Sequence, residues 1–192
     1  PYLDEYLSPL TREKLYSDGG ASMDALIREG KQILLPRGPE DMRTSAKTLW
    51  IRKDWLDKVG LPIPKTLDDF LEVADAFVNK DTNGVGKDDT YAVGIAGKDN
   101  LILDWGGLSG FFEMFDVQPG IWFDQSLFYE KNASGEVIWS GSKPQVKDAL
   151  ATLRDMYKNG ALAKDFGTID AGGKLAQDIT ASKCGMFFDS AW

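Results

Sequence analysis

Residues 66–95, TLDDFLEVADAFVNKDTNGVGKDDTYAVGI, place a helical pattern, an acidic loop and a strand pattern in direct succession. Thr66 and Asp69 have the spacing of a capping box, with Asp where Glu is more usual. Apolar residues then recur on one helical face, at Leu67, Phe70, Leu71, Ala74, Phe77 and Val78. Residues 91–95 alternate like a strand that enters the core. The stretch therefore predicts a helix, a loop and a strand, which is the repeating order of α/β domains.

The loop between this helix and this strand concentrates oxygen-bearing residues and glycines. Hard cations such as Ca²⁺ take roughly six to eight oxygen ligands, and a glycine lets the backbone turn around the ion. Ala92 stands where a complete EF-hand has a bidentate Glu. A metal-free Asx/Gly turn is the alternative, because Asp, Asn and Gly form turns unaided. The predicted calcium ligands are Asp81, Asn83, Val85, Lys87 and Asp89, with Val85 and Lys87 acting through their carbonyls.

Short apolar runs on both sides of this stretch predict further strands. They lie at residues 32–36, 48–52 and 184–188, and a hairpin is expected from residues 123–129 and 137–139 with its turn at 132–135. The run at 184–188 contains Cys184 and is wholly apolar or glycine, which is typical of a buried strand.

Three further helices are expected from periodic apolar positions and terminal residues. They run from Asp54 to Gly60, from a cap at Ser142 to just before Gly160, and over residues 175–180. The face of the second is expected to hold Val146, Ala149, Leu150, Leu153 and Tyr157. Strands that alternate with helices predict an α/β fold, a mixed sheet flanked by helices.

Composition excludes several classes of function. The chain has 192 residues, of which 43% are apolar and 27% charged, as in a globular protein. Its net charge of -8 argues against a nucleic-acid partner, because phosphate binding needs clustered positive charge. There is no histidine, so Ser-His-Asp and Cys-His catalysis and His-ligated zinc are all excluded. Cys184 is the single cysteine and cannot form an internal disulfide.

Tryptophan is frequent, with six in the chain. Trp50 and Trp55 are expected in the core, where large rings pack for their buried area. Trp105 and Trp192 lie at the ends of predicted elements, close after acidic residues. Ligands of α/β sheets collect where strands end. An aromatic face beside carboxylates suits a sugar, so these two tryptophans are candidate sugar contacts.

The sequence contains no complete motif of an enzyme active site among those considered. Ser109 lies among glycines without the spacing of a nucleophile elbow. A carboxylate pair drawn from Asp104, Glu113 and Asp116 could hydrolyse a glycosidic bond, but nothing in the spacing selects one pair. A polysaccharide-acting hydrolase therefore stays as an alternative, and a calcium-stabilised structural or adhesion module is another.

Five stretches occur in an order that resembles one known family. They are GKQILLP at 30–36, LWIRKDWLDKVG at 49–60, PKTLDDF at 64–70, DTNGVGKDDT at 81–90, and GMFF at 185–188 leading to Trp192. In this order they resemble the extracellular solute-binding proteins of ABC importers. Within that family, the chain is most similar to the lipoprotein-type, oligosaccharide-binding subgroup that includes the alginate-binding proteins. The similarity covers nearly the whole chain.

The resemblance implies a maltose-binding-protein-like fold of two lobes, the type 2 periplasmic-binding-protein fold, of which this chain is a fragment. Residues 1–36 would be the tail of the first lobe and the crossover, and residues 37–192 would be the second lobe, with the calcium-type loop at 81–90. Trp192 matches an aromatic residue that stacks on sugar, and the segment from Asp99 to Trp105 matches a ligand-contacting segment. The implied ligand-binding residues are Trp192, Trp105, Asp104, Asn100, Asp99 and Arg37.

The same resemblance implies a function without catalysis. The expected ligand is an oligosaccharide, the expected partner is the membrane permease of the importer, and calcium is the expected structural cofactor. Val85 departs from relatives that carry a polar side chain there, which leaves only its carbonyl for the ion. The protein is expected to act as a monomer outside the cytoplasm, as a cell-surface lipoprotein or in the periplasm.

Overall fold

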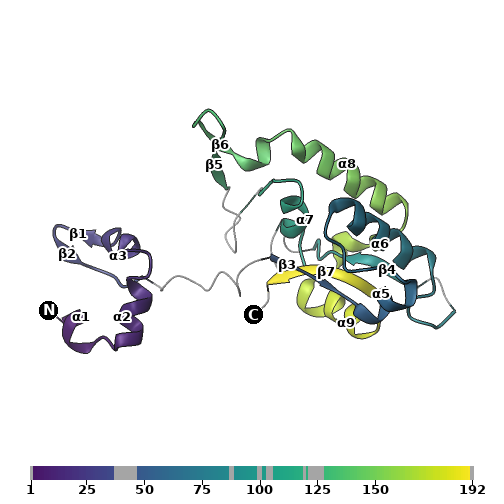
Figure 1. Cartoon of the computed structure of the whole chain (residues 1–192), viewed down its shortest axis with the longest axis horizontal. Coiled ribbons are helices and arrows are strands. Elements are labelled where there is room, and N and C mark those ends of the chain that lie inside the picture. The colour runs from purple at the N-terminus through teal and green to yellow at the C-terminus, as the bar shows by residue number, and fades with distance from the viewer. Residues whose placement is uncertain are drawn as a thin grey trace. The chain divides into compact units, whose positions relative to one another are not determined.

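The computed structural model describes residues 2–36, 47–86, 89–98, 101–102, 106–118, 120 and 128–190. The chain divides into two compact units, whose described residues lie within 2–36 and, with the gaps just given, within 47–190 (Figure 1). No helix within these ranges has the length and apolar character needed to cross a membrane.

The first unit consists of short elements. Three helices, α1 (Tyr2–Tyr6), α2 (Pro9–Leu15) and α3 (Ala21–Asp24), precede the two-residue strands β1 (Ile27–Arg28) and β2 (Lys31–Gln32). The strand predicted at residues 32–36 is wrong, because only Gln32 belongs to a ladder. Ile33, Leu34 and Leu35 follow without regular structure and are 51–61% exposed. The apolar run alone could not distinguish a strand from an exposed segment.

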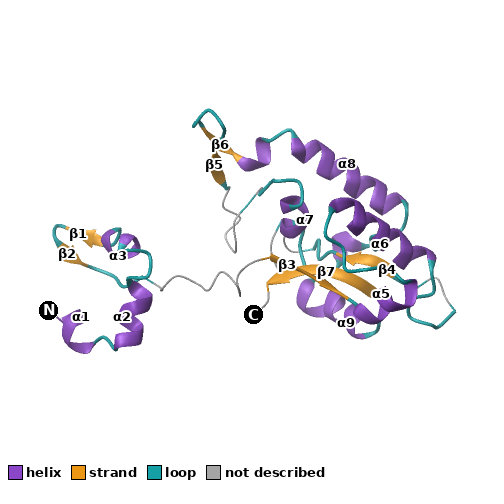
Figure 2. Ribbon diagram, viewed as in Figure 1, coloured by secondary structure: helices purple, strands orange, loops and turns teal. Residues whose placement is uncertain are grey.

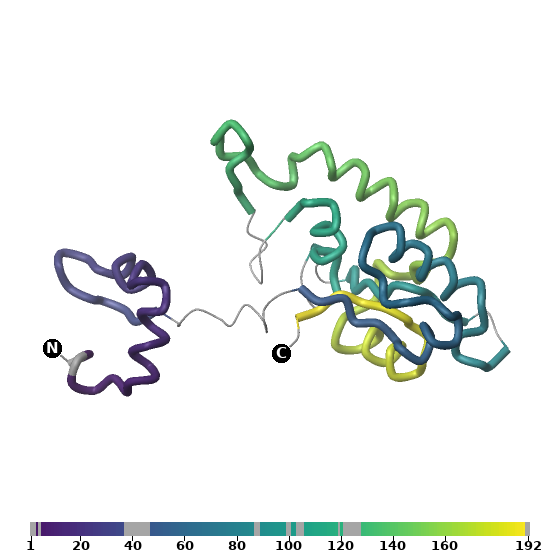
Figure 3. The backbone as a smooth tube through the Cα atoms, in the orientation of Figure 1, coloured from purple at the N-terminus to yellow at the C-terminus, as the bar shows by residue number. Residues whose placement is uncertain are grey.

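The second unit contains a three-stranded mixed sheet. Its strands are β3 (Lys47–Ile51), β4 (Tyr91–Gly94) and β7 (Cys184–Ser190), in the order β3-β7-β4. The central strand β7 pairs antiparallel with β3 and parallel with β4. Figure 3 shows β3 in blue beside β7 in yellow, although they are far apart in the sequence. The predicted α/β fold with a mixed sheet is confirmed.

Helices flank this sheet, and a separate hairpin joins α7 to α8 (Figure 2). The helices are α5 (Lys53–Val59), α6 (Leu67–Asn79), α7 (Ser109–Glu113), α8 (Gln145–Lys158) and α9 (Ala176–Thr180). The hairpin strands are β5 (Tyr129–Lys131) and β6 (Val137–Trp139), paired antiparallel. Single turns lie at Ser140–Ser142 and Phe166–Thr168, and a π-helical turn at Ala171–Leu175 leads into α9.

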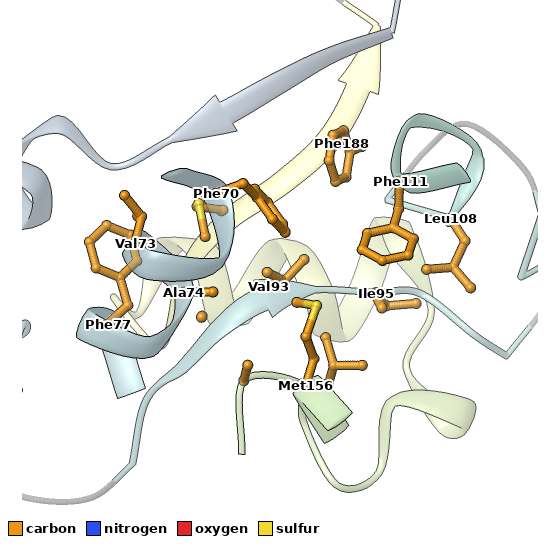
Figure 4. Close-up of a cluster of buried hydrophobic side chains, with 14 of the residues drawn as sticks. Phe70, Val73, Ala74, Phe77, Val93, Ile95, Leu108, Phe111, Met156 and Phe188 are labelled. Atoms are coloured by element: carbon orange, nitrogen blue, oxygen red, sulfur yellow. The ribbon is translucent and has the colours of Figure 1, made fainter. Parts of the chain in front are cut away.

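The main core lies between the sheet and α6, α7 and α8 (Figure 4). Phe70 and Phe77 of α6 are 1% and 0% exposed. Phe70 packs against Phe111 of α7 and Phe188 of β7, with ring centroids 6.4 and 6.0 Å apart. Trp55 of α5 meets Phe77 edge-on at 5.2 Å. Burial of these aromatic rings is the main force that holds α6 on the sheet.

The sequence signals at the ends of α5 and α6 are confirmed. Thr66 and Asp69 form both halves of the capping box, because each side chain accepts a hydrogen bond from the other residue's backbone N–H. Gly60 ends α5 with φ of 75°, in the left-handed region.

Ser142 does not cap α8, contrary to the prediction. The helix begins after Pro144, whose fixed φ suits a helix start, and the Ser142 hydroxyl instead donates to the carbonyl of Trp139 at 2.7 Å. The predicted face of α8 is confirmed in part: Ala149 is buried and Val146 and Leu153 pack against the core, which Met156 also enters. Leu150 and Tyr157 are 52% and 41% exposed.

The two tryptophans predicted to lie in the core differ. Trp55 is 1% exposed, as predicted. Trp50 is 44% exposed and lies parallel to Phe187, with centroids 6.1 Å apart. Strand alternation gives the reason, because β3 turns Leu49 and Ile51 toward the core and Trp50 to the opposite face.

Candidate functional site

The loop that follows α6 is built around the carboxylate of Asp81. Its two oxygens accept hydrogen bonds from the backbone N–H groups of Gly84 and Gly86, at 2.7 and 2.9 Å. Both glycines have positive φ, 77° and 67°. The turn therefore uses glycine's conformational freedom to wrap the backbone around one carboxylate.

Asn83 ties together the described parts of the loop. Its amide oxygen accepts from the N–H of Val85 at 3.2 Å, and its amide nitrogen donates to Asp89 at 3.0 Å. The same nitrogen lies 3.4 Å from the carbonyl oxygen of Ser182, in the turn before β7. Asn83 thus holds Asp89 through a hydrogen bond, whereas Lys87 lies outside the described residues.

The loop's oxygen donors fit a hard cation. Two carboxylates and an amide are oxygen ligands of the kind that calcium takes, and they lie in a loop whose turns already depend on positive φ. In the part of the chain that the structure describes, no three His, Cys, Asp or Glu side chains are grouped closely enough to hold a metal. Any ion here would therefore need the Asn83 amide and backbone carbonyls besides Asp81 and Asp89.

Lys58 of α5 holds the loop from the outside. Its ammonium group donates to the carbonyl of Thr82 at 3.0 Å and lies 3.4 Å from that of Asp81. Thr82 itself is 3% exposed. Lys80, just after α6, makes a second contact with α5 by donating to the carbonyl of Val59 at 3.2 Å. These contacts could not be predicted from the sequence, because a surface lysine is usually a solvated charge.

The six predicted ligand-binding residues lie outside the described residues, so the structure does not place them. They are Arg37, Asp99, Asn100, Asp104, Trp105 and Trp192.

The strands that lead toward two of these residues are described. The parallel strands β4 and β7 end at one edge of the sheet. There the N–H of Gly106 donates to the carbonyl of Phe188 at 3.1 Å, and the N–H of Ala96 donates to the carbonyl of Gly106 at 2.8 Å. Gly106 directly follows Trp105, and Phe188 lies four positions before Trp192. The backbone of Gly106, next to the predicted sugar contact Trp105, is therefore hydrogen-bonded to β7, the strand that precedes the predicted sugar contact Trp192.

A second polar cluster lies in a smaller core and was missed at the sequence level. The Tyr91 hydroxyl donates to Asp178 at 3.0 Å, Lys174 also pairs with Asp178, and Asp178 is 4% exposed. Burial, then the nearby Cys184 and Asp178, raises the pKa of Tyr91 above its usual value. A hydrogen-bonded cluster of this kind, with Asp178 and Tyr91 buried, stabilises the position of α9.

Two of the three acids proposed for hydrolysis, Glu113 and Asp116, lie in the described part of the chain. The carboxylate of Asp116 is 86% exposed and pairs with Lys143 at 2.7 Å. Glu113 is exposed at the end of α7, and Asp104 lies outside the described residues.

The family model and the similar curated proteins point to one family. The model of the family "bacterial extracellular solute-binding protein" matches residues 6–192. The chain is 37% identical over 140 residues to the lipoprotein LipO of Bacillus subtilis, covering 73% of this chain and 26% of LipO. It is 30% identical over 152 residues to the fructooligosaccharide ABC transporter substrate-binding protein FusA of Streptococcus pneumoniae, covering 79% of this chain and 26% of FusA. The chain thus spans about a quarter of these relatives.

Solved structures agree on the fold. An HMO-binding, ABC-transporter-associated solute-binding protein from Bifidobacterium longum infantis matches with a TM-score of 0.72 and 21% identity, covering 98% of this chain and 38% of that one. FusA in complex with kestose matches with a TM-score of 0.66 and 25% identity, covering 98% and 37%. The alginate-binding protein AlgQ2, in a structure without calcium ion, matches with a TM-score of 0.65 and 19% identity, covering 98% and 35%.

Proposed function

The chain belongs to the bacterial extracellular solute-binding proteins, and from this premise we propose that it is part of the oligosaccharide receptor of an ABC importer. In this proposal residues 1–36 belong to the first lobe and its crossover, and residues 37–192 form the second lobe. The sugar lies at the carboxyl ends of β4 and β7. Its contacts are Arg37, Asp99, Asn100, Asp104, Trp105 and Trp192.

One observation carries this proposal. The hydrogen bond from Gly106 to Phe188 joins the segment after β4 to the end of β7, at the edge of the sheet where ligands of α/β folds collect. FusA, described with kestose bound, supports an oligosaccharide as the ligand class. Closure of the two lobes on the sugar, with hinges near Pro36 and Trp192, would hold it in place.

Isothermal titration of the full-length protein tests the proposal. The panel contains kestose, longer inulin-type fructo-oligosaccharides and oligogalacturonates. We expect saturable binding of at least one series, with a change in tryptophan fluorescence. Trp192→Ala should weaken that binding, whereas Trp50→Ala, which removes a half-exposed tryptophan of β3, should not. Absence of heat and of fluorescence change across the panel would overturn the proposal.

We further propose that the loop at residues 81–90 binds calcium as a structural ion. The residues that would hold it are Asp81, Asn83 and Asp89 through their side chains and Val85 and Lys87 through their carbonyls. The ion would neutralise the two carboxylates and fix the connection from α6 to β4. Saturating calcium at about one hundred times its Kd should stabilise the fold by about 2.7 kcal/mol. Asp81→Asn should remove that response, and an unchanged melt of the wild-type protein in chelator and in excess calcium would contradict the site.

The proposal makes this protein a binding protein and not an enzyme, which the solute-binding relatives support. Its macromolecular partner is the importer's permease, and it acts outside the cytoplasm as a monomer. A lipid anchor is supported by the likeness to the lipoprotein LipO. Release of shorter sugars from the panel, lost in Glu113→Gln or Asp116→Asn, would instead favour the hydrolase.

A further inference from the structure

The β5–β6 hairpin presents an aromatic face that no proposed role yet uses. Tyr129 pairs with Trp139 and Lys131 with Val137 across the two strands, so these four side chains share one face. Tyr129, Val137 and Trp139 are 56%, 62% and 36% exposed. Glu130 and Ile138, on the other face, are less exposed. We call the face of Tyr129, Lys131, Val137 and Trp139 the hairpin ledge.

The turn of the hairpin is closed by local hydrogen bonds. The side-chain oxygen of Asn132 accepts from the N–H groups of Ser134 and Glu136, both at 3.0 Å. The N–H of Asn132 donates to the carbonyl of Glu136 at 2.9 Å, and Gly135 supplies a positive φ of 82°. These contacts fix the register, and so fix which side chains share the ledge.

The root of the hairpin is equally well held. The buried hydroxyl of Ser140 accepts from the N–H of Gln118 at 2.9 Å. The ammonium group of Lys143 bridges Asp116 at 2.7 Å and Glu130 at 3.0 Å, and its side chain is only 13% exposed. The hairpin is thereby tied both to the turn after α7 and to the start of α8. The ledge is exposed, but it stands on a rigid support.

The indole of Trp139 is positioned by a glycine. A Cβ atom on Gly141 would lie 2.3 Å from the Trp139 ring, so the ring rests over the bare backbone at this position. Trp139 and Tyr129 thus offer ring surface on a support that is fixed before any ligand arrives, which lowers the entropic cost of binding.

The size of the ledge limits what can bind there. Two strands of three residues, with a rise of about 3.4 Å per residue and a spacing of about 4.8 Å, give a face only about 10 Å long and one strand spacing wide. A standard protein–protein interface buries about 800 Å² per partner, much more than this face offers. A few sugar rings fit, since their C–H faces stack on aromatic rings and Lys131 can donate to hydroxyl or carboxylate oxygens.

We propose that Tyr129 and Trp139 form an outer stacking subsite for the part of a linear oligosaccharide that extends beyond the sugars held by Trp105 and Trp192. This inference rests on the proposed oligosaccharide function. In the view of Figure 1 the hairpin lies above the sheet, on the side of the unit toward which the arrow of β7 points. An outer subsite makes affinity depend on chain length.

Titration of the full-length protein with graded inulin-type fructo-oligosaccharides, from kestose upward, and with graded oligogalacturonates tests the subsite. In whichever series binds, Tyr129→Ala and Trp139→Ala should weaken the longer members by roughly 2- to 10-fold and leave the shortest member unchanged. Tyr129→Phe keeps the ring and should restore most of the affinity. Gly141→Ala, which displaces the Trp139 ring, should copy Trp139→Ala.

Leu150→Ala on α8 is the matched control, because it removes an apolar side chain that is 52% exposed and distant in sequence from the hairpin. It should change no affinity. Wild-type affinity of Tyr129→Ala and Trp139→Ala for the longer members, in protein whose melting temperature is unchanged, would overturn the outer subsite and leave the proposed function standing. Failure of the wild-type protein to bind either series would overturn both.

Discussion

The ammonium nitrogen of Lys58 lies 3.0 Å from the carbonyl oxygen of Thr82 and donates a hydrogen bond to it. This contact joins the last turn of α5 to the loop after α6. Lys58→Met keeps most of the apolar stem and removes the donor. We expect it to lower the free energy of unfolding by about 1 kcal/mol, measured by urea denaturation, because a partly buried carbonyl loses a charged partner.

Lys53 provides the control on the same helix. It pairs with Asp57 at 2.7 Å, but the two side chains are 74% and 64% exposed. An exposed pair at this spacing contributes about 0.3–0.5 kcal/mol. Lys53→Met should therefore cost less than Lys58→Met, and equal losses would argue that Lys58 is another surface charge.

The capping box of α6 predicts a second loss of stability. The Thr66 hydroxyl accepts from the N–H of Asp69 at 3.1 Å. Thr66→Ala leaves this N–H without its partner and should cost about 1 kcal/mol in urea denaturation. Thr66→Ser keeps the oxygen and should recover most of the loss. A serine variant as unstable as the alanine variant would show that the threonine methyl group, and not the cap, is what matters.

The other half of the box predicts a pH dependence. The Asp69 carboxylate accepts from the N–H groups of Lys65 at 2.9 Å and Thr66 at 3.1 Å. The bond from Lys65 and then the one with Thr66 hold the pKa of Asp69 below its usual value. Because the folded-state pKa is the lower one, this stabilisation is present above the unfolded pKa of about 3.9 and is lost as pH falls through the folded pKa. The stability gap between wild type and Asp69→Asn should therefore close in acid, and a gap that persists there would contradict the assignment.

The backbone of β7 passes so close to α6 that one position accepts only glycine. A Cβ atom on Gly185 would lie 2.4 Å from the ring of Phe77. Gly185→Ala should cost about 1–3 kcal/mol of unfolding free energy through overpacking. Gly167→Ala is the control, since no atom lies within 4 Å of a Cβ built there. Similar melting temperatures for both variants would show that the core relaxes around the added methyl group.

Local signals predicted much of the fold. The capping box, the apolar face of α6 and the glycine after α5 depend on residues a few positions apart, and each lies where the sequence predicted it. The buried run that begins at Cys184 is the central strand. The predicted cap at Ser142 was wrong because Pro144 provides a better helix start. The predicted burial of Trp50 was wrong because the sequence does not reveal which face of β3 is covered.

The candidate site was less predictable, because its supports are distant in sequence. The spacing of Asp81, Asn83 and Asp89 indicated the loop. Its contacts with Lys58 and with Ser182, which lies 99 positions beyond Asn83, arise only when α5, α6 and β7 pack together. Ion pairs such as that of Lys143 with Asp116, 27 positions away, have the same origin.

Labelling of the Cys184 thiol reports whether β7 is exposed to solvent. Cys184 is the chain's single cysteine and is 1% exposed in the central strand. Its thiol donates to the carbonyl of Met186 at 3.2 Å, and burial raises the pKa of the thiol to about 12. A protonated and covered thiol does not attack a disulfide reagent. We expect no reaction with Ellman's reagent in native buffer at about pH 8 and rapid reaction in denaturant, where the thiol pKa returns to about 8.5. Rapid labelling of the native protein would contradict the burial of β7.

The raised pKa of Cys184 also predicts that the free energy of unfolding falls at alkaline pH. The folded-state pKa lies above the unfolded one, so the stabilisation from the neutral Cys184 thiol is complete below about pH 8.5 and is lost as pH rises toward the folded value. Cys184→Ala should therefore make urea denaturation less sensitive to pH on the alkaline side. The sensitivity should fall without vanishing, because Tyr91, whose pKa is also raised by burial, still binds its proton more tightly in the folded protein. Equal alkaline slopes in wild type and Cys184→Ala would mean that the thiol ionises as freely in the sheet as in the unfolded chain.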